Sequence, residues 1–363
     1  APADAKRIIE TNPKQRDIGT MQPLLSRRQA LGLALAGALA GALVGVPPAF
    51  GQDMTLFRIG TGGVAGTYYP VGALLAGILS SPPGGRTCAE GGGCGVPGLV
   101  AVAQSSAGTI ENLNRVVEGS FEAGLAQGDI AYAAYTGTGL FAGKPPADRL
   151  RVIASLYRES LHVVARPGRG ITTIADLRGR RISVDMPESG TRADALLVLD
   201  AYGLGGDAVK LVKATAAEAG TMLREGTLEA FFYIAGYPVL VVSELTGDRL
   251  ARLLAVDGKV REGIVARQPL LTYDLIPPGI YPGTGATPTV GVMSQLVVSA
   301  ALDADLAYAI TAALWHPSAR LLLDQGHVKA KEITLASAVQ TQGVPLHPGA
   351  ERYYREVGAL GGP

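Results

Sequence analysis

The stretch from Leu56 to Tyr69, LFRIGTGGVAGTYY, constrains the fold more than any other part of the sequence. An apolar run passes into a glycine-rich loop and then into a helix start, which is typical of a strand followed by a loop and a helix. The glycines let a ligand approach the backbone closely, and the free N–H groups of a helix start suit an anionic or zwitterionic guest. The alternative is an ordinary turn that binds nothing.

The same loop does not match the known phosphate-binding motifs. In the dinucleotide pattern G-x-G-x-x-G, started at Gly60, the third glycine position falls on Ala65. The Walker pattern fails because no Lys-Ser or Lys-Thr pair follows. An exported enzyme with a dinucleotide-like glycine loop therefore remains only an alternative.

Units of the same kind recur along the chain. Residues 98–104 and 121–127 are expected strands that each lead into a helix start, and 181–184 is a strand that leads through a loop into a helix at 192–202. Alternating strands and helices with loops at the strand ends predict an α/β fold of doubly wound lobes. Two long β stretches, 150–166 and 289–299, are suited to cross between the lobes.

The charge distribution argues against a nucleic-acid partner. Of the 32 Lys and Arg and the 31 Asp and Glu, six and three lie in the first 51 residues, which leaves 26 basic and 28 acidic side chains in the rest. The chain beyond residue 51 therefore lacks a basic footprint. With 47% hydrophobic and 17% charged residues, it has the composition of a folded protein.

Residues 1–51 are interpreted as an export signal of the twin-arginine type. Arg27 and Arg28 precede an uncharged run rich in Ala, Leu and Gly, and AFG before Gln52 fits a cleavage site after Gly51. The protein is therefore expected in the periplasm. A membrane anchor is the alternative, since the run approaches the ~18 apolar residues of a membrane-spanning helix.

The two cysteines, Cys88 and Cys94, lie in the glycine-rich segment GGRTCAEGGGCGVPG. In an exported protein a local disulfide is the expected state of this pair. Zinc is the competing interpretation, but no histidine is near in sequence.

Three loops share one chemistry: 60–67, 105–112 and 188–191 each combine hydroxyls with the amides of a helix start. Lobes that present such loops to each other would form a cleft for a small carboxylate. The sequence gives less support for a catalytic site than for a binding site. Ser189 does not lie in a G-x-S-x-G motif, and no histidine has a recognisable nucleophile or carboxylate partner. The acids Glu111 and Asp129 are interpreted as helix surface residues. The chain is not expected to be an enzyme or to need a cofactor.

Several segments, in order, resemble the TAXI family, the solute receptors of tripartite ATP-independent periplasmic (TRAP) transporters. They are IGTGGVAGTYYPVG, GTIENLNRVVEGSFEAGLAQGDIAYAAYTGTG, LRVIASLYRESLHVVAR, ITTIADLRGRRISVDMPESGT, LEAFFYIAGYP and VPLHPGAERYYREVG. The resemblance covers nearly everything from Leu56 to Gly358. The resemblance implies a two-lobed type II periplasmic binding protein with its ligand cleft between the lobes. The first lobe is expected to begin with residues 52–158 and the second to comprise 159–292. The chain is then expected to return to the first lobe at 293–363.

The resemblance also implies a solute and a partner. The solute would be a small carboxylate, either a glutamate-like amino acid or a 2-oxoglutarate-like dicarboxylate, and the partner a TRAP membrane permease. The ligand contacts carried over by motif are Thr61, Gly62, Gly63, Val64, Tyr68, Ser106, Thr109, Asn112, Gln127, Ser189, Gly190, Thr191, Ala235 and Gly236. We expect the carboxylate to dock on amides of the first and third loops while Asn112 and Gln127 bind its other polar groups. A ligand-sensing module for a membrane partner is a further alternative.

Overall fold

The computed structural model describes residues 54–360. The expected export signal at 1–51 lies outside these residues. Within the described range, no helix combines the length and the apolar character needed to cross a membrane.

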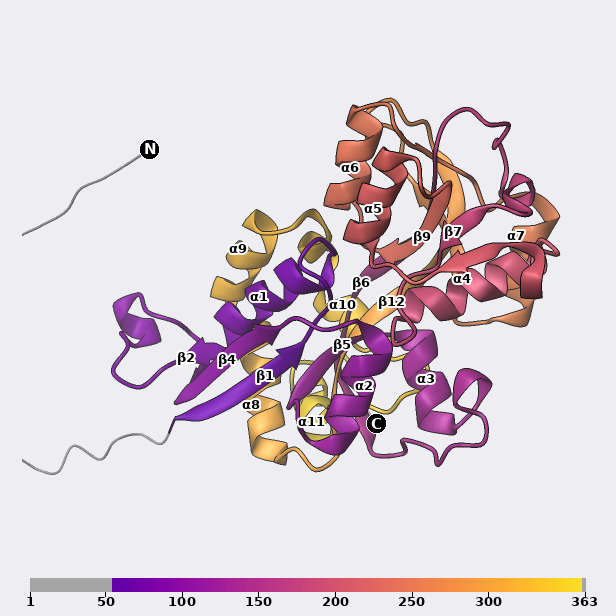
Figure 1. The fold of residues 1–363 in the computed structure, drawn as a ribbon. Coiled ribbons are helices and arrows are strands. Elements are labelled where there is room, and N and C mark those ends of the chain that lie inside the picture. The colour runs from indigo at the N-terminus through magenta and orange to yellow at the C-terminus, as the bar shows by residue number, and fades with distance from the viewer. Residues whose placement is uncertain (1–53, 361–363) are drawn as a thin grey trace, which may run out of the picture. The chain divides into compact units, whose positions relative to one another are not determined.

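The strands form one large sheet and a small pair (Figure 1). The large sheet has ten strands in the order β4-β1-β5-β12-β6-β9-β7-β8, with β10 beside β6 and β11 beside β12. Its strands are β1 (Thr55–Gly60), β4 (Leu99–Gln104), β5 (Ala123–Gln127), β6 (Leu150–Ala165), β7 (Arg181–Ser183), β8 (Lys210–Val212), β9 (Ala230–Ala235), β10 (Arg252–Leu253), β11 (Thr272–Ile276) and β12 (Thr287–Ser299). The small pair is β2 (Ser80–Ser81) and β3 (Val96–Pro97).

The helices cover the faces of the large sheet, as expected where parallel strands are joined by crossovers. The α-helices are α1 (Tyr68–Leu79), α2 (Thr109–Glu118), α3 (Gly128–Thr136), α4 (Gly190–Ala201), α5 (Ala216–Glu225), α6 (Leu240–Gly247), α7 (Gly258–Arg267), α8 (Ala304–Leu314), α9 (Pro317–Gln325), α10 (Leu335–Ala338) and α11 (Pro348–Glu356). The short 3₁₀ turns are η1 (Cys88–Glu90), η2 (Gly139–Phe141), η3 (Ile174–Leu177), η4 (Gly206–Ala208) and η5 (Val328–Glu332).

Two groups of parallel strands are joined by two long antiparallel strands. In the first lobe β1 lies between β4 and β5, and in the second lobe β7 lies between β8 and β9. Strands β6 and β12 pair with each other, β12 also pairs with β5, and β6 also pairs with β9. Because β6 and β12 run through both lobes, the two sheets of the expected fold merge into one, with register shifts between β6 and β12 near Met293.

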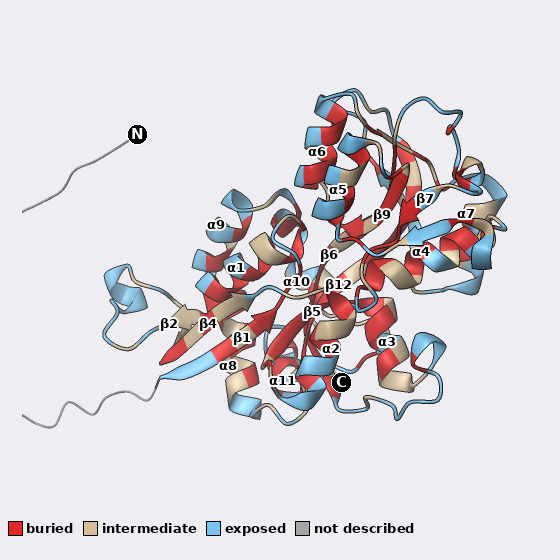
Figure 2. Cartoon of the chain, viewed as in Figure 1, coloured by how far each residue is buried: buried red, intermediate tan, exposed pale blue. Residues whose placement is uncertain are grey.

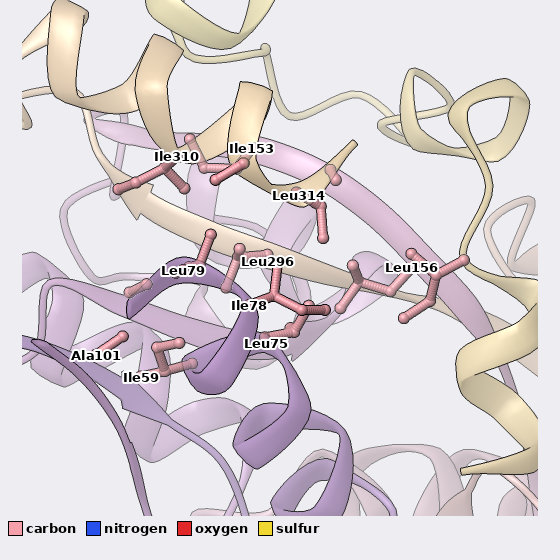
Figure 3. Packing of buried hydrophobic residues seen from close by; sticks show 14 of the residues in the cluster. Ile59, Leu75, Ile78, Leu79, Ala101, Ile153, Leu156, Leu296, Ile310 and Leu314 are labelled. Carbon is pink, nitrogen blue, oxygen red and sulfur yellow. The ribbon is translucent and has the colours of Figure 1, made fainter. Parts of the chain in front are cut away.

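The buried apolar side chains form separate cores in the two lobes (Figure 2). Two clusters belong to the first lobe and two to the second. In the first lobe, Leu75 and Leu79 of α1 pack with Ile59 of β1 and with Leu296 of β12 (Figure 3). A fully buried side chain of this kind stabilises the folded state by roughly 1.5–3 kcal/mol. We retain the lobe boundaries at 158 and 292 as a proposal that these clusters support.

The structure corrects some sequence-based expectations. The long β stretch expected at 150–166 is present as β6, which continues through Arg158 with Glu159 and Ser160 buried. Strands β8 and β11 and helix α7 were not expected, since they carry little apolar periodicity.

The expected disulfide between Cys88 and Cys94 is present. A histidine that is remote in sequence, His316, lies close to this pair, with a ring nitrogen within 4.8 Å of both sulfurs. Both sulfurs are already bonded to each other in this structure.

Candidate functional site

A cavity of about 330 Å³ opens where the carboxyl ends of the strands of both lobes meet. This is the edge at which open α/β sheets bind ligands. The cavity wall combines the loop after β1, the loop after β4, the ends of β5 and β9, the loop after β7 and the start of α5. Most of the sequence-predicted residues line it, namely Gly62, Gly63, Val64, Tyr68, Ser106, Thr109, Gln127, Ser189, Gly190, Thr191 and Ala235. Thr61, Asn112 and Gly236 are not part of its wall.

The first loop has free amides on the cavity. Among the hydrogen bonds of the described residues, none has the backbone N–H of Gly62, Gly63 or Val64 as its donor. The carbonyls of the same loop are held from behind, since Ser105 Oγ donates to Gly62 O at 2.9 Å and Ser106 Oγ donates to Thr61 O at 2.9 Å. The loop therefore has three amides without partners among the described residues, while two of its carbonyls are already hydrogen-bonded.

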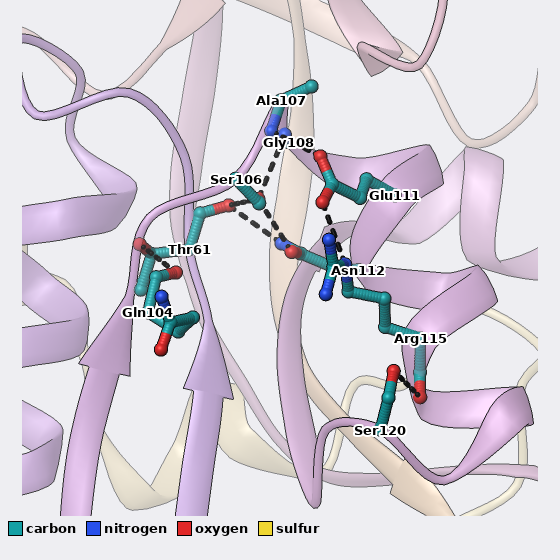
Figure 4. A network of polar contacts seen from close by, with 9 residues as sticks. All are labelled: Thr61, Gln104, Ser106, Ala107, Gly108, Glu111, Asn112, Arg115 and Ser120. Atoms are coloured by element: carbon teal, nitrogen blue, oxygen red, sulfur yellow. Dashed lines mark hydrogen bonds and ion pairs between the residues drawn. The ribbon is translucent and has the colours of Figure 1, made fainter.

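Asn112 supports this loop from behind (Figure 4). Its Nδ2 donates to Thr61 O at 2.7 Å and to Leu125 O at 2.8 Å, and its Oδ1 accepts from Ser106 Oγ at 2.7 Å. The side chain is fully buried. The expectation that Asn112 binds ligand polar groups directly does not fit this geometry, because its hydrogen-bonding capacity is used within the protein.

The start of α2 is already occupied. The amides of Ala107 and Gly108 donate to the side chains of Glu111 and Ser106, while the amides of Ile110 and Glu111 donate to the carbonyl of Glu188 in the second lobe, at 3.1 and 3.3 Å. The expectation of free amides in this loop therefore fails at these four residues, whereas the Thr109 amide donates none of the hydrogen bonds found among the described residues. This helix start instead holds the two lobes together.

The third loop is built around the N-terminus of α4. Ser189 Oγ accepts from the Thr191 amide at 3.1 Å and donates to Asp185 Oδ2 at 2.9 Å, and Thr191 Oγ1 accepts from the Ile234 amide at 3.1 Å. Gly190 leaves room for Gln127, whose Oε1 would lie 1.8 Å from a Cβ at this position. The loop is thus fixed against both β9 and β5.

Further contacts join the lobes around the cavity. Thr67 Oγ1 donates to the carbonyl of Gly236, and Gln127 Nε2 donates to Asp194 Oδ2. The hydroxyl of Tyr233 lies 2.0 Å from the place where a Cβ on Gly66 would stand. These contacts describe a cleft in its closed arrangement.

Acidic side chains form the part of the site that sequence reasoning missed. Glu159 and Asp185 line the cavity, and Asp194 lies behind it. Burial raises the pKa of Glu159 to about 8 against the opposing hydrogen bond from Tyr68, and burial raises the pKa of Asp185 to about 6. The available signal was a single carboxylate near the middle of a long β stretch of 16 residues, β6.

Asp129 also differs from its expected role as a surface acid. Its carboxyl makes a hydrogen bond with that of Asp194, and burial raises the pKa of both groups. Glu111, the other acid considered from sequence, instead accepts from Arg115 Nε at 2.7 Å.

Comparison with known proteins gives a family and a set of structural neighbours. A sequence model of the NMT1-like family matches residues 59–358. MatC from Rhodopseudomonas palustris with bound malate has a TM-score of 0.50 and 14% identity, over 83% of this chain and 98% of that chain. The alkanesulfonate-binding protein SsuA from Xanthomonas axonopodis pv. citri, bound to MOPS, has a TM-score of 0.40 and 17% identity, over 84% of each chain. The fold is the two-lobed α/β fold of periplasmic binding proteins.

Proposed function

The chain belongs to the NMT1-like family, and from this membership we propose that it is a periplasmic receptor that binds a small carboxylate in its cleft and releases it unchanged. The narrower part of the proposal is that the receptor is of the TAXI type and delivers its solute to a TRAP membrane permease. The solute would be a glutamate-like amino acid or a 2-oxoglutarate-like dicarboxylate.

The observation that carries the proposal is the row of amides at Gly62, Gly63 and Val64, which line the cavity between two lobes and donate none of the hydrogen bonds of the described residues. Backbone N–H groups next to a helix start favour a carboxylate, and α1 begins at Tyr68 just beyond them. A cavity of about 330 Å³ suits a metabolite of a few carbon atoms.

Closure of the lobes would give the receptor its affinity. The contacts of Thr67 with Gly236 and of Gln127 with Asp194 join opposite lobes, so they form only when the cleft is shut. A solute that bridges the lobes favours the closed state by as much as it binds that state better than the open one. Hydrogen bonds to charged groups contribute roughly 1.5–3 kcal/mol each, so a few could supply micromolar affinity, near −8 kcal/mol.

The binding proposal is tested by calorimetric titration of the purified protein with a panel of small carboxylates. We expect at least one member to bind with a micromolar dissociation constant and to raise the melting temperature. A nicotinamide cofactor serves as the matched control for the enzyme alternative and should leave the melting temperature unchanged. If no carboxylate binds, the proposed solute class is wrong.

The export proposal has its own test, which is the mass of the mature protein. In a bacterium with an intact twin-arginine system we expect a periplasmic chain that begins at Gln52. A protein that keeps residues 1–51 and remains in the membrane fraction would favour the anchor instead.

A further inference from the structure

The cavity has an acidic side as well as an amide side. Glu159 enters from β6, the long strand shared by both lobes, and Asp185 enters from the loop that follows β7. Among the described residues that line the cavity there is no Lys or Arg. A solute that carried only negative charge would therefore face two carboxyl groups with no cation on the wall.

Of the two acids, Glu159 gives the stronger evidence, because its carboxyl is buried and only one of its two oxygens accepts a hydrogen bond. The side chain is 2% exposed, and its Oε2 accepts from the Tyr68 hydroxyl at 2.7 Å. No donor within the described part of the chain bonds its Oε1, and Glu159 is absent from the ion pairs found there. A buried carboxyl on a cavity wall with a free acceptor oxygen is a ready partner for a ligand N–H group.

Asp185 is held in place for a similar role. Its Oδ1 accepts from the Met186 amide at 2.9 Å and its Oδ2 accepts from Ser189 Oγ at 2.9 Å. Its backbone φ is 71°, a left-handed value that non-glycine residues adopt at a cost and that concentrates at functional sites. Each oxygen keeps a further lone pair, so the carboxylate can accept another hydrogen bond.

The cation that acts on Glu159 is already committed. Lys329 is buried behind the cavity, its Nζ lies 2.8 Å from Glu332 Oε1 and 3.7 Å from the centre of the Tyr237 ring. Asp129 and Asp194 add two more carboxyls on the far side of Gln127. The charged groups that act on Glu159 therefore include buried carboxyls as well as this one engaged cation.

We propose that Glu159 and Asp185 bind a protonated amine of the solute, so that this receptor takes zwitterionic amino acids in preference to 2-oxo acids. The inference rests on the proposed function, since the amides of the first loop would hold the carboxylate of the same molecule. An ammonium group donates three hydrogen bonds, which the two carboxyls can accept, whereas a keto oxygen in that place can accept but not donate. With its raised pKa Glu159 can carry a proton when the cavity is empty, and an ammonium group would favour its ionised form and gain a charge-assisted hydrogen bond that a keto oxygen cannot supply.

The test compares pairs of solutes in which an amine is replaced by a keto group on the carbon next to the carboxylate. The pairs are glutamate with 2-oxoglutarate, and leucine with 4-methyl-2-oxopentanoate. Calorimetric dissociation constants are measured for the wild-type protein and for Glu159→Gln and Asp185→Asn, with thermal melting to show that each variant is folded. We expect the better-binding amino acid to bind at least tenfold more tightly than its 2-oxo counterpart. We expect Glu159→Gln, or Asp185→Asn if the first variant fails to fold, to remove most of that preference.

Equal or tighter binding of the 2-oxo acids would overturn the amine inference and leave the carboxylate receptor standing. A preference for amino acids that neither folded variant reduces would overturn the assignment of the amine to these two residues. If no member of either pair binds, the carboxylate proposal fails together with the inference.

Discussion

At the scale of single residues, the site depends on side chains that never touch its cavity. Asn112 fixes Thr61 and Leu125, which belong to two neighbouring strands and their loops, while Gly60 leaves room for it, because a Cβ there would lie 2.5 Å from Asn112 Oδ1. A polar residue with all its partners satisfied inside the protein is a structural element, even where a motif suggests ligand contact.

We therefore predict that Asn112→Ala lowers the free energy of unfolding by roughly 2–4 kcal/mol, because it removes the hydrogen bonds of this fully buried side chain to Thr61 O, Leu125 O and Ser106 Oγ. Denaturant unfolding measures this change. The matched control is Asn114→Ala, on the exposed face of the same helix, which should change stability little. Similar effects of the two substitutions would mean that the Asn112 network contributes nothing.

The buried acids predict a pH dependence of stability. The pKa of Glu159 is raised to about 8 and that of Asp185 to about 6, and the pKa values of Asp129 and Asp194 are also raised. The folded protein thus binds these protons more tightly than the unfolded chain, so the stability present at acidic pH is lost as the pH rises through the folded values. Tyr68, Tyr157 and Lys329 also influence Glu159.

Without solute, the melting temperature should fall between about pH 5 and pH 9, and Glu159→Gln should flatten the upper part of that slope. For this buried group the change is on the order of a few kcal/mol, since each unit of pKa difference corresponds to about 1.4 kcal/mol. A melting temperature that rises over this range would show that the carboxyls are ionised in the folded protein.

At the scale of elements, the closed cleft depends on how tightly the loop after β1 meets β9. Gly66 faces the hydroxyl of Tyr233 at a distance that leaves no room for a methyl group. Its φ lies outside the left-handed region, so alanine adds no backbone strain. The added methyl group would meet the Tyr233 hydroxyl first, so the position reports mainly on how closely this loop meets β9.

We predict that Gly66→Ala weakens carboxylate binding at least tenfold by opposing closure. Adding Tyr233→Phe should restore most of the affinity, because the next ring atom, Cζ, lies 3.3 Å from the added Cβ position. Calorimetry of the single and double variants measures both effects. An unchanged dissociation constant in Gly66→Ala, or no rescue by the second substitution, would show that this contact does not form in the bound state.

At the scale of the whole molecule, the repeated strand and helix units were enough to predict the α/β class and the long crossing strands. Glycine and hydroxyl residues at helix starts indicated three loops that line the cavity, and the family resemblance supplied the individual ligand contacts, which stay a prediction. The acids were missed because Glu159 and Asp185 come from separate elements that only the folded sheet places on one cavity. The occupied start of α2 was missed because its partner, the carbonyl of Glu188, lies in the other lobe.

The central claim is that a small carboxylate docks on the amides of the first loop. It is tested most directly by NMR of ¹⁵N-labelled protein titrated with the tightest-binding carboxylate of the panel. We expect the amide resonances of Gly62, Gly63 and Val64 to shift strongly, while those of Gly84 and Gly91 in the disulfide segment remain in place. Binding that shifts resonances elsewhere and leaves the first loop unchanged would contradict the account.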